Sequence, residues 1–386
     1  MEGNWIDCKL GDILNFRRGH DLPHSEMKGG DIPVAGSNGI IGYHNIASPV
    51  SPCITIGRSG NVGTPFIYEK AWAHNTTLYI DDFKGNDPLY IFYLLKTLPL
   101  SSFGGGSAVP TLNRNHIHPL IVHHCTDISE QKRIAAMLKS FDDKIELNNR
   151  INHNLEEQAQ ALYKSWFVDF EPFKDGKFVE SELGMIPEGW KVGFVNTIID
   201  IQSGFAFKSE TFVNNGIYRL ITIKAVQDGY LETKGADQIS SIPAKMPKYC
   251  ILSLGDILLS LTGNVGRVCI VDQDKLLLNQ RVAKIQPRDE INRFFSYCLF
   301  RNEEFKNSMI QLARGTAQLN LSPVETGCIK IVYPNYETMS QFSRVGLGLY
   351  NTILSNRIEN LRLTLLRDSI LPRIMSGELN INEIYC

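Results

Sequence analysis

The sequence repeats itself at an interval of 185 residues near its start and of about 205 residues further along, and this repeat constrains the fold more than any other feature. Each copy starts with a tryptophan and a strand-like segment that ends at a glycine. Each copy later carries a Gly-Asn-Val-Gly loop between two apolar, strand-like segments. The matched positions are Trp5 with Trp190, Gly19 with Gly204, Gly60–Gly63 with Gly263–Gly266, and Asn75 with Asn279. Two such copies predict two domains that share one fold.

Each copy is expected to form a mixed α/β (α+β) domain followed by a long helix. Apolar strands alternate with polar turns, short apolar helices follow at residues 88–98 and 293–305, and a closing strand follows at 120–122 and 329–332. We therefore divide the chain into four parts: a first domain at 1–126, a first helix at 127–170, a second domain with its linker at 171–336, and a second helix with a tail at 337–386.

Both long helices carry a heptad pattern. Seam residues alternate with spacings of four and three from Ile134 to Trp166, and a less regular pattern runs from Leu349 to Ile374. Each seam contains two asparagines that lie four residues apart, namely Asn148, Asn152, Asn356 and Asn360. A polar residue on such a seam costs stability and fixes the register. Pairing of the two helices within one chain is favoured over pairing between chains, because the asparagines match and one chain carries both helices.

Length and composition are those of an ordinary globular protein. The chain has 386 residues, enough for two or three domains, and 43% of them are hydrophobic and 21% charged. The N-terminus does not resemble a signal peptide, and no apolar stretch is long enough to span a membrane. The eight cysteines are scattered without a C-x-x-C pair. We therefore expect a cytoplasmic protein with no membrane partner.

The net charge and the architecture point in different directions. The formal net charge is −2, whereas nucleic-acid-binding domains are usually basic, so DNA binding would need local patches or a basic partner. Two similar domains held apart by paired helices nevertheless suit duplex DNA, because the symmetry of a protein mirrors the spacing of its half-sites. Since the two domains differ in sequence, the two half-sites should differ as well.

Six short motifs follow one another in a fixed order: Trp5–Asp12, Gly36-Ser-Asn-Gly-Ile-Ile-Gly-Tyr-His44, Ile56-Gly-Arg-Ser-Gly-Asn-Val-Gly63, Glu130-Gln-Lys-Arg-Ile134, Leu162-Tyr-Lys-Ser-Trp-Phe167 and Leu371-Pro-Arg-Ile-Met-Ser-Gly-Glu-Leu379. Through these motifs the chain resembles the specificity subunit of type I restriction–modification systems over essentially its full length. Each motif is weak alone. Their order, the repeat and the two long helices together are specific.

The resemblance implies that each unit is a target-recognition domain for one half of a split DNA sequence. It also implies an antiparallel coiled coil that sets the gap between the halves, and a chain without catalytic activity. The expected partners are double-stranded DNA, two modification subunits that methylate adenine, and restriction subunits driven by ATP. No cofactor is expected on this chain, since S-adenosylmethionine, ATP and Mg belong to those partners. In one departure from the family, we expect Gly346 and Gly348 to interrupt the second helix.

Candidate DNA contacts are polar and basic residues in the predicted turns. Arg reads guanine and Asn or Gln reads adenine, while Lys, Arg, Ser, Thr and loop N–H groups bind phosphate. The candidates in the first domain are Arg17, Arg18, Lys28, Arg58, Ser59, Asn61, Ser107, Thr111, Asn113 and Arg114. Those in the second are Lys208, Ser209, Lys224, Asn264, Arg267, Arg281, Arg314, Thr316, Gln318 and Asn320.

These candidates are expected to have two kinds of role. A Gly-Asn-Val-Gly loop shared by domains that read different sequences is assigned to phosphate or DNA shape. Base readers are expected where the two halves differ. Our preferred pairs are Arg17-Arg18 against Gln202-Ser203, and residues 109–114 against 318–323.

The sequence predicts no catalytic or metal centre. Asp87-Pro-Leu-Tyr90 resembles the Asp-Pro-Pro-Tyr motif of amino methyltransferases, but it lacks the second proline and is better explained as the start of a helix. Four histidines lie close in sequence without a set of acidic or cysteine ligands to complete a metal site, namely His116, His118, His123 and His124.

Three alternative functions stay open: the specificity subunit of a fused restriction–methylation system, a coiled-coil scaffold that binds protein, and a stand-alone methyltransferase with an unrecognised site.

Overall fold

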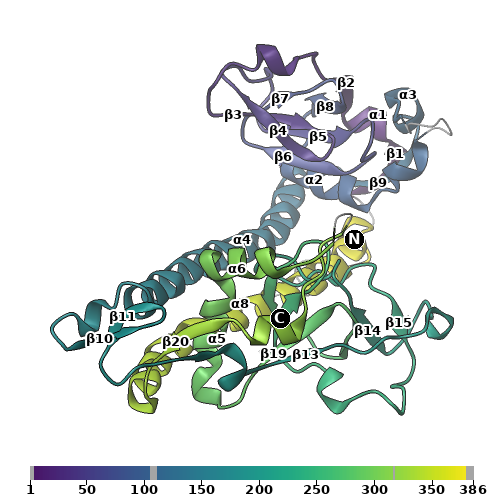
Figure 1. Cartoon of the computed structure of the whole chain (residues 1–386). Helices are drawn as coiled ribbons and strands as arrows, with labels where there is room; N and C mark the ends of the chain where they lie inside the picture. The colour runs from purple at the N-terminus through teal and green to yellow at the C-terminus, as the bar shows by residue number, and fades with distance from the viewer. Residues whose placement is uncertain (1–3, 105–110, 316–317, 380–386) are drawn as a thin grey trace. The chain divides into compact units, whose positions relative to one another are not determined.

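The structure is a computed structural model that describes residues 4–104, 111–315 and 318–379. It divides into two compact units, one formed by residues 1–145 and 362–386 and the other by residues 146–361. Each unit contains one domain together with part of each long helix (Figure 1).

Among the described residues, the two domains contain the same nine strands in the same order. Those of the first domain are β1 (Trp5–Lys9), β2 (Asn15–Arg18), β3 (Ile32–Gly36), β4 (Gly39–His44), β5 (Cys53–Gly57), β6 (Pro65–Tyr68), β7 (Trp72–Ala73), β8 (Thr77–Asp82) and β9 (Ile121–Cys125). Those of the second are β12 (Lys191–Phe194), β13 (Ile199–Ser203), β14 (Tyr218–Ile221), β15 (Gln238–Ile239), β16 (Ile257–Ser260), β17 (Val268–Ile270), β18 (Leu276–Leu278), β19 (Val282–Pro287) and β20 (Lys330–Tyr333).

The strands also pair in the same way in both domains. A four-stranded sheet has the order β2-β8-β5-β6 in the first domain and β13-β19-β16-β17 in the second. A three-stranded sheet has the order β4-β3-β7 or β15-β14-β18, and a two-stranded sheet pairs β1 with β9 or β12 with β20. In each three-stranded sheet one pair is parallel, β3 with β7 and β14 with β18. The predicted repeat of two mixed α/β domains is confirmed.

The strand match corrects one position of the sequence repeat. Gly19 and Gly204 occupy the same place in the two domains, and a Cβ added to either would lie only 2.1 or 2.2 Å from a carbonyl oxygen. That oxygen belongs to His74 in the first domain and to Asn279 in the second. Asn279 therefore corresponds to His74, and the predicted match of Asn75 with Asn279 was wrong by one residue.

Short helices pack against the sheets of each domain. They are α1 (Leu10–Ile13), α2 (Pro88–Thr97) and α3 (Arg114–Ile117) in the first domain, and α5 (Arg293–Arg301), α6 (Glu303–Leu312) and α7 (Pro323–Gly327) in the second. Asp87 caps α2, since its Oδ1 accepts the Tyr90 N–H at 2.9 Å, and Pro88 follows at the first helical position. The Asp87–Tyr90 tetrapeptide is thus the start of a helix.

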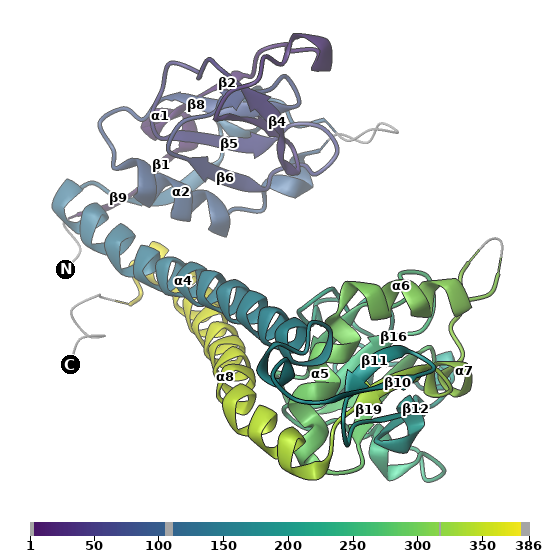
Figure 2. The same ribbon diagram turned by 60° about the vertical axis from the view of Figure 1, so that its left-hand side comes forward.

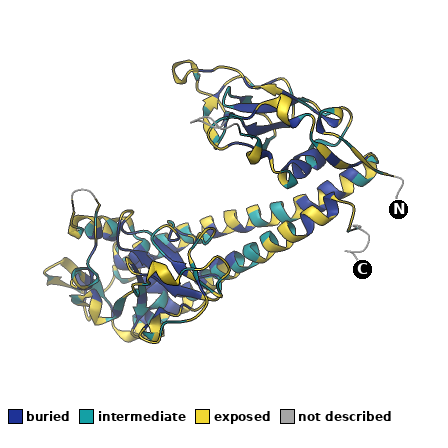
Figure 3. Cartoon of the chain, turned by 90° about the vertical axis from the view of Figure 1, so that its right-hand side faces the viewer, coloured by how far each residue is buried: buried dark blue, intermediate teal, exposed yellow. Residues whose placement is uncertain are grey.

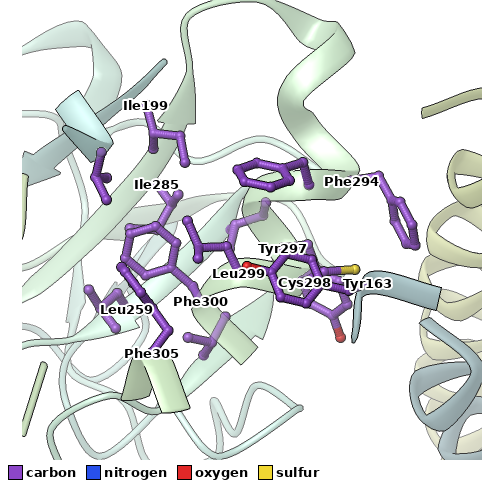
Figure 4. Close-up of a cluster of buried hydrophobic side chains, with 14 of the residues drawn as sticks. Tyr163, Ile199, Leu259, Ile285, Phe294, Tyr297, Cys298, Leu299, Phe300 and Phe305 are labelled. Atoms are coloured by element: carbon purple, nitrogen blue, oxygen red, sulfur yellow. The ribbon is translucent and has the colours of Figure 1, made fainter. Parts of the chain in front are cut away.

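Each domain has a core between its four-stranded sheet and one short helix. In the second domain, Ile199, Leu259 and Ile285 of the sheet pack against the aromatic side chains of α5, and Tyr163 joins them from the first long helix (Figure 4). The first domain has an equivalent core around α2. Buried residues lie on strands and helices, while the turns are largely exposed (Figure 3).

The two long helices are α4 (Ile128–Phe167) and α8 (Tyr336–Met375), and they pair within the chain (Figure 2). In the second unit, the amide of Asn148 donates to Asn360 at 2.9 Å, and that of Asn356 donates to Asn152 at 2.9 Å. In the first unit, Asp142 pairs with Arg367. Positions rise along α4 as their partners fall along α8, so the predicted intramolecular, antiparallel coiled coil is confirmed.

The predicted interruption of the second helix was wrong. Helix α8 continues through Gly346 and Gly348. A Cβ at Gly346 would lie 1.8 Å from Cε1 of Phe294 on α5, whereas a Cβ at Gly348 would meet no atom within 4 Å. Gly346 therefore allows α8 to approach α5 closely, and this tertiary contact outweighs the low helix propensity of glycine.

The segment that joins α4 to the second domain is more ordered than its proline and glycine content indicated. It contains a hairpin of β10 (Phe178–Ser181) and β11 (Gly184–Pro187). An aromatic cluster anchors it, in which Trp190 packs against Phe167 at 5.5 Å and against Phe170 at 5.4 Å between ring centroids. Trp190 thus lies at the end of α4, as Trp5 lies against Gly377 just after α8.

Candidate nucleic-acid interface

Six of the candidate residues in the first domain line one surface hollow of about 400 Å³. They come from three places in the chain: strand β2, the loop after β5, and the segment that leads into α3. The six are Arg17, Arg18, Arg58, Thr111, Asn113 and Arg114. Three segments far apart in sequence therefore gather four guanidinium groups around one hollow, although the chain as a whole is slightly acidic.

Acidic residues hold the two arginines of β2. The Nε of Arg17 lies 2.6 Å from Oδ2 of Asp81, and this aspartate also accepts from the amide of Asn15 at 2.6 Å. Asp81 is largely buried while Arg17 is 63% exposed, so the pair fixes the guanidinium at the surface. Arg18 lies 3.8 Å from Asp21, and because both side chains are exposed, water screens the attraction between them.

Arg114 and His118 both bind the backbone of Phe16 in β2. Arg114 donates from Nη1 to the Phe16 carbonyl at 3.1 Å, and the Phe16 N–H donates to Nε2 of His118 at 3.1 Å. Burial lowers the pKa of His118, and the positive charges of Arg114 and Lys84 lower it further. The neutral imidazole is the form that can accept this hydrogen bond, so His118 ties α3 to the strand that carries Arg17 and Arg18.

The Gly-Asn-Val-Gly loop has the same shape in both domains. The Gly63 N–H donates to the Gly57 carbonyl at 2.8 Å, and the Gly266 N–H donates to the Ser260 carbonyl at 3.1 Å. Gly63 has a φ of +80° and Gly266 a φ of +83°, and both values lie in the left-handed region that favours glycine. Asn61 of this loop accepts from the Thr64 hydroxyl at 3.1 Å.

A second segment pairs with this loop in each domain. Ser59 forms a bridge with Thr111, and Thr262 forms the equivalent bridge with Asn320. In the second domain the Thr262 hydroxyl also donates to Oδ1 of Asn320 at 2.9 Å. The equivalence makes Ser59 the counterpart of Thr262, and Thr111 that of Asn320.

The second domain places further candidates beside the same loop. Arg314 and Asn320 exchange two backbone hydrogen bonds, and Nε2 of Gln318 lies 3.3 Å from the position of a Cβ at Gly263. Arg281 has φ of +71°, and its carbonyl accepts the Leu261 N–H at 2.9 Å. The side chain of Arg314 pairs with Glu325, which lowers its local charge.

Arg267 belongs to a side-chain network at the end of the loop. It donates from Nη1 to Oε1 of Gln227 at 2.6 Å. With the Asn264 amide turned to accept, its oxygen lies 3.1 and 3.2 Å from the two terminal nitrogens of Arg267. Lys224 is exposed, and its carbonyl accepts from the Gln227 amide at 2.7 Å. The network thus joins Lys224, Asn264 and Arg267 through Gln227.

The turn between β3 and β4 lies beside the candidate interface and was missed by the sequence analysis. A Cβ at Gly57 would lie 3.2 Å from the Ser37 carbonyl, and one at Gly60 would lie 3.5 Å from the Ser37 hydroxyl. Ser37 therefore lies beside the loop after β5. The polar turn that contains it, Gly36-Ser-Asn-Gly39, was visible in the sequence, but nothing local indicated its contact with a loop twenty residues away.

Three candidates have their printed contacts away from these loops, and two others lie outside the described residues. The Lys28 N–H donates to Nδ1 of His44 at 3.2 Å, and Lys208 lies 3.4 Å from Glu210 with both side chains exposed. Ser209 begins a short 3-10 turn next to Lys208. Ser107 and Thr316 lie outside the described residues.

Two of the four clustered histidines, His123 and His124, have separate contacts. The Nδ1 of His123 lies 2.8 Å from Asp7, and the imidazole stacks on Trp5 at 5.3 Å between centroids. His124 is buried beside Tyr90. In the parts of the chain that the structure describes, no group of three or more His, Cys, Asp or Glu could hold a metal ion.

None of the described helices is long and apolar enough to cross a membrane.

Comparisons with known proteins agree on one family. The family model of the type I restriction modification DNA specificity domain matches residues 2–157 and 187–353. The chain is 29% identical over 307 residues to the MjaIX specificity subunit of Methanocaldococcus jannaschii, which covers 76% of this chain and 70% of that protein. It is 28% identical over 315 residues to the HindI specificity subunit of Haemophilus influenzae, which covers 66% of this chain and 68% of that one.

One solved structure shares the fold of the whole chain. The crystal structure of the type I restriction–modification S subunit from M. genitalium superposes with a TM-score of 0.59 at 16% sequence identity. The match covers 95% of each chain. At this identity the likeness concerns the fold alone.

Proposed function

The chain belongs to the type I restriction–modification DNA specificity family, and on that premise we propose that each of its two domains reads one half of an asymmetric, bipartite DNA site. The chain itself carries out recognition and no chemistry. The rest of the proposal follows from the two interfaces described above.

The observation that carries the proposal is that equivalent loops have one backbone shape and different side chains. Position 58 is Arg and its counterpart, Leu261, is apolar, while Thr111 corresponds to Asn320. Arg17 and Gln202 stand two residues before Gly19 and Gly204, the equivalent glycines that follow β2 and β13. A shared backbone supports a shared way of meeting the duplex, and different donors and acceptors support different bases.

We further propose roles for the long helices and for the partners. The coiled coil of α4 and α8 would set the gap between the two half-sites. Two modification subunits would methylate adenine with S-adenosylmethionine, and restriction subunits would use ATP and Mg. The complex would work in the cytoplasm, where cellular DNA is available.

Binding of the full chain to duplex DNA at two salt concentrations tests the proposal. Binding to phosphates releases counterions, so we expect the affinity for a mixed-sequence duplex to fall steeply between about 50 and 200 mM salt. Replacing Arg17, Arg18 and Arg58 with Ala should reduce the salt slope by about one for each phosphate that the variant no longer neutralises. Lys139→Ala on α4 is the matched control, because Lys139 pairs with Asp143 one turn along the same helix, and it should leave the slope unchanged.

Two results would contradict the proposal. Absence of DNA affinity, or an affinity that salt does not change, would favour the protein-binding scaffold. Binding of S-adenosylmethionine by the chain alone would favour a stand-alone methyltransferase.

A further inference from the structure

A largely buried ion cluster lies where the helix pair meets the second domain. Glu156 of α4 accepts from Arg357 of α8 at 2.7 Å and from Arg301 at the end of α5 at 2.6 Å. The three side chains are only 10 to 18% exposed. One carboxylate thus holds two guanidinium groups in a poorly hydrated place, where an unbalanced charge is costly.

The cluster continues into a loop of the second domain. Arg301 also pairs with Asp228, and Lys306 of α6 lies 3.1 Å from the same aspartate. The next residue, Gly229, has φ of +92°, and a Cβ there would lie 3.4 Å from Arg301 and 3.6 Å from Glu156. The turn at Asp228 and Gly229 therefore rests directly on the ion cluster.

The same turn leads to the candidate DNA contacts. Gln227 precedes Asp228 and accepts from Arg267, which in turn contacts Asn264 in the Gly-Asn-Val-Gly loop. The Gly229 N–H donates to the Val268 carbonyl at 2.8 Å, which fixes the turn to the strand that follows that loop. A continuous series of contacts therefore runs from Glu156 to Asn264 within one unit.

The first unit also has an ion cluster on its helices, but the described partners of its carboxylate do not lead to the candidate DNA contacts. Asp142 of α4 pairs with Arg367 of α8, accepts from the Tyr93 hydroxyl at 2.7 Å, and lies 3.8 Å from Lys96. These partners lie on α2 and α8, and none of them is a candidate DNA contact. The two domains thus differ in how their interfaces are connected to the helix pair.

We propose that Glu156 is a positioning residue for DNA recognition by the second domain. It holds Arg301 and Arg357, and through Arg301 and Asp228 it fixes the turn that orients Gln227, Arg267 and Asn264. This inference rests on the proposed function and adds to it a connection between the helix pair and one half-site only.

The physical reason is the charge balance of the cluster. Glu156→Gln keeps the size of the side chain and one oxygen, but it removes the charge that offsets two buried guanidinium groups. Arg301 would then keep Asp228 as its remaining carboxylate partner in the cluster and shift toward it. The turn at Asp228 and Gly229 would move with it, and the support of Arg267 by Gln227 would loosen.

The test is a selection of duplexes from a random-sequence library by the purified full chain, followed by sequencing. For the wild-type chain we expect a motif with two halves and a fixed gap. Arg17→Ala identifies the half that the first domain reads. Glu156→Gln should lower the base preference in the other half at least fivefold and leave the first half within twofold of the wild type. Asp142→Asn, which removes a helix carboxylate whose described partners include no candidate contact, should change neither half.

Asp228→Asn provides a second variant that leaves the helix pair intact, because Asp228 is 46% exposed and lies outside α4 and α8. It should relax the same half as Glu156→Gln. Equal loss in both halves, or no loss in either, for both variants would overturn the role of Glu156. A wild-type chain that selects no motif would instead overturn the proposed function, and the inference would fall with it.

Discussion

Arg17 stands at the surface because a carboxylate of β8 holds it there. Such a fixed guanidinium suits bidentate recognition of guanine, which discriminates between bases by about 1–3 kcal/mol. We expect Arg17→Ala combined with Arg18→Ala to relax recognition in one half-site and to leave the other unchanged. The measurement is the affinity for duplexes that carry base changes in either half. Gln202→Ala is the matched variant in the second domain and should affect the opposite half, so equal loss in both halves for either variant would contradict independent domains.

His118 gives the first domain a pH dependence. Its pKa is lowered from the ordinary value of 6.5 in the folded chain, so the unfolded chain binds this proton more readily. Its stabilising contribution is therefore complete above about pH 6.5 and is lost as the pH falls through the folded-state pKa. His118→Gln keeps an acceptor for the Phe16 N–H but cannot titrate. We expect its Tm to fall less than that of the wild type between about pH 7.5 and pH 5.5; an equal fall would assign the effect to His74 and His124, whose pKa values burial also lowers.

At the scale of single residues, the sequence predicted which residues gather at the candidate interface better than it predicted the contacts between them. Arginine and amide side chains were sufficient to identify most of the residues around the hollow of the first domain. The prediction that they lie in turns was wrong for Arg17 and Arg18, which lie on β2, and for Arg114, which begins α3. The contact of Ser37 with the loop after β5 depends on how two sheets meet, and no local pattern encodes it. The same holds for Asp81, whose role emerges only when β8 lies beside β2.

Among the elements, α8 shows how tertiary contact overrides helix propensity. Gly346→Ala should destabilise the chain by about 1–3 kcal/mol, because the added methyl group would overlap the ring of Phe294. Gly348→Ala is the control on the same helix, where the methyl group meets open space, and it should stabilise by up to about 1 kcal/mol. Denaturant unfolding of both variants distinguishes them. Equal changes in the free energy of unfolding at the two positions would show that packing against Phe294 does not require a glycine at position 346.

The helix pair is expected to act as a spacer. Residues 147–153 of α4 and 355–361 of α8 face each other around the asparagine contacts. Deleting both heptads removes about 10 Å of helix, which equals about three base pairs. We expect the selected motif to keep its bases and lose about three base pairs of its gap. Deleting one heptad alone should disrupt the register and abolish selection, whereas an unchanged gap in the double deletion would remove the spacer role.

The heptad pattern predicted both helices because an apolar repeat of 3.5 residues can be recognised in the sequence without knowledge of the fold. It did not predict that α8 passes through two glycines, since the reason lies on α5. The ion cluster at Glu156 was also invisible, because its members come from α4, α5, α8 and a loop that are far apart in sequence.

For the whole molecule, the internal repeat carried most of the information. Matched motifs half a chain apart require two copies of one fold, and the nine equivalent strands follow from that. The bases that each domain reads do not follow, because readout depends on the placement of a few side chains against the duplex. The family resemblance supplied the biological role, and the different side chains on one shared backbone support two unlike half-sites.

The most direct measurement of the central claim is single-molecule sequencing of DNA from cells that carry this chain together with the modification subunit proposed as its partner. We predict methylated adenines in a motif of two unlike halves with a fixed gap, absent when the gene for this chain is deleted. The Arg17→Ala and Arg18→Ala double variant should change one half of that motif. Methylation that persists unchanged after the deletion would contradict the claim that this chain selects the target.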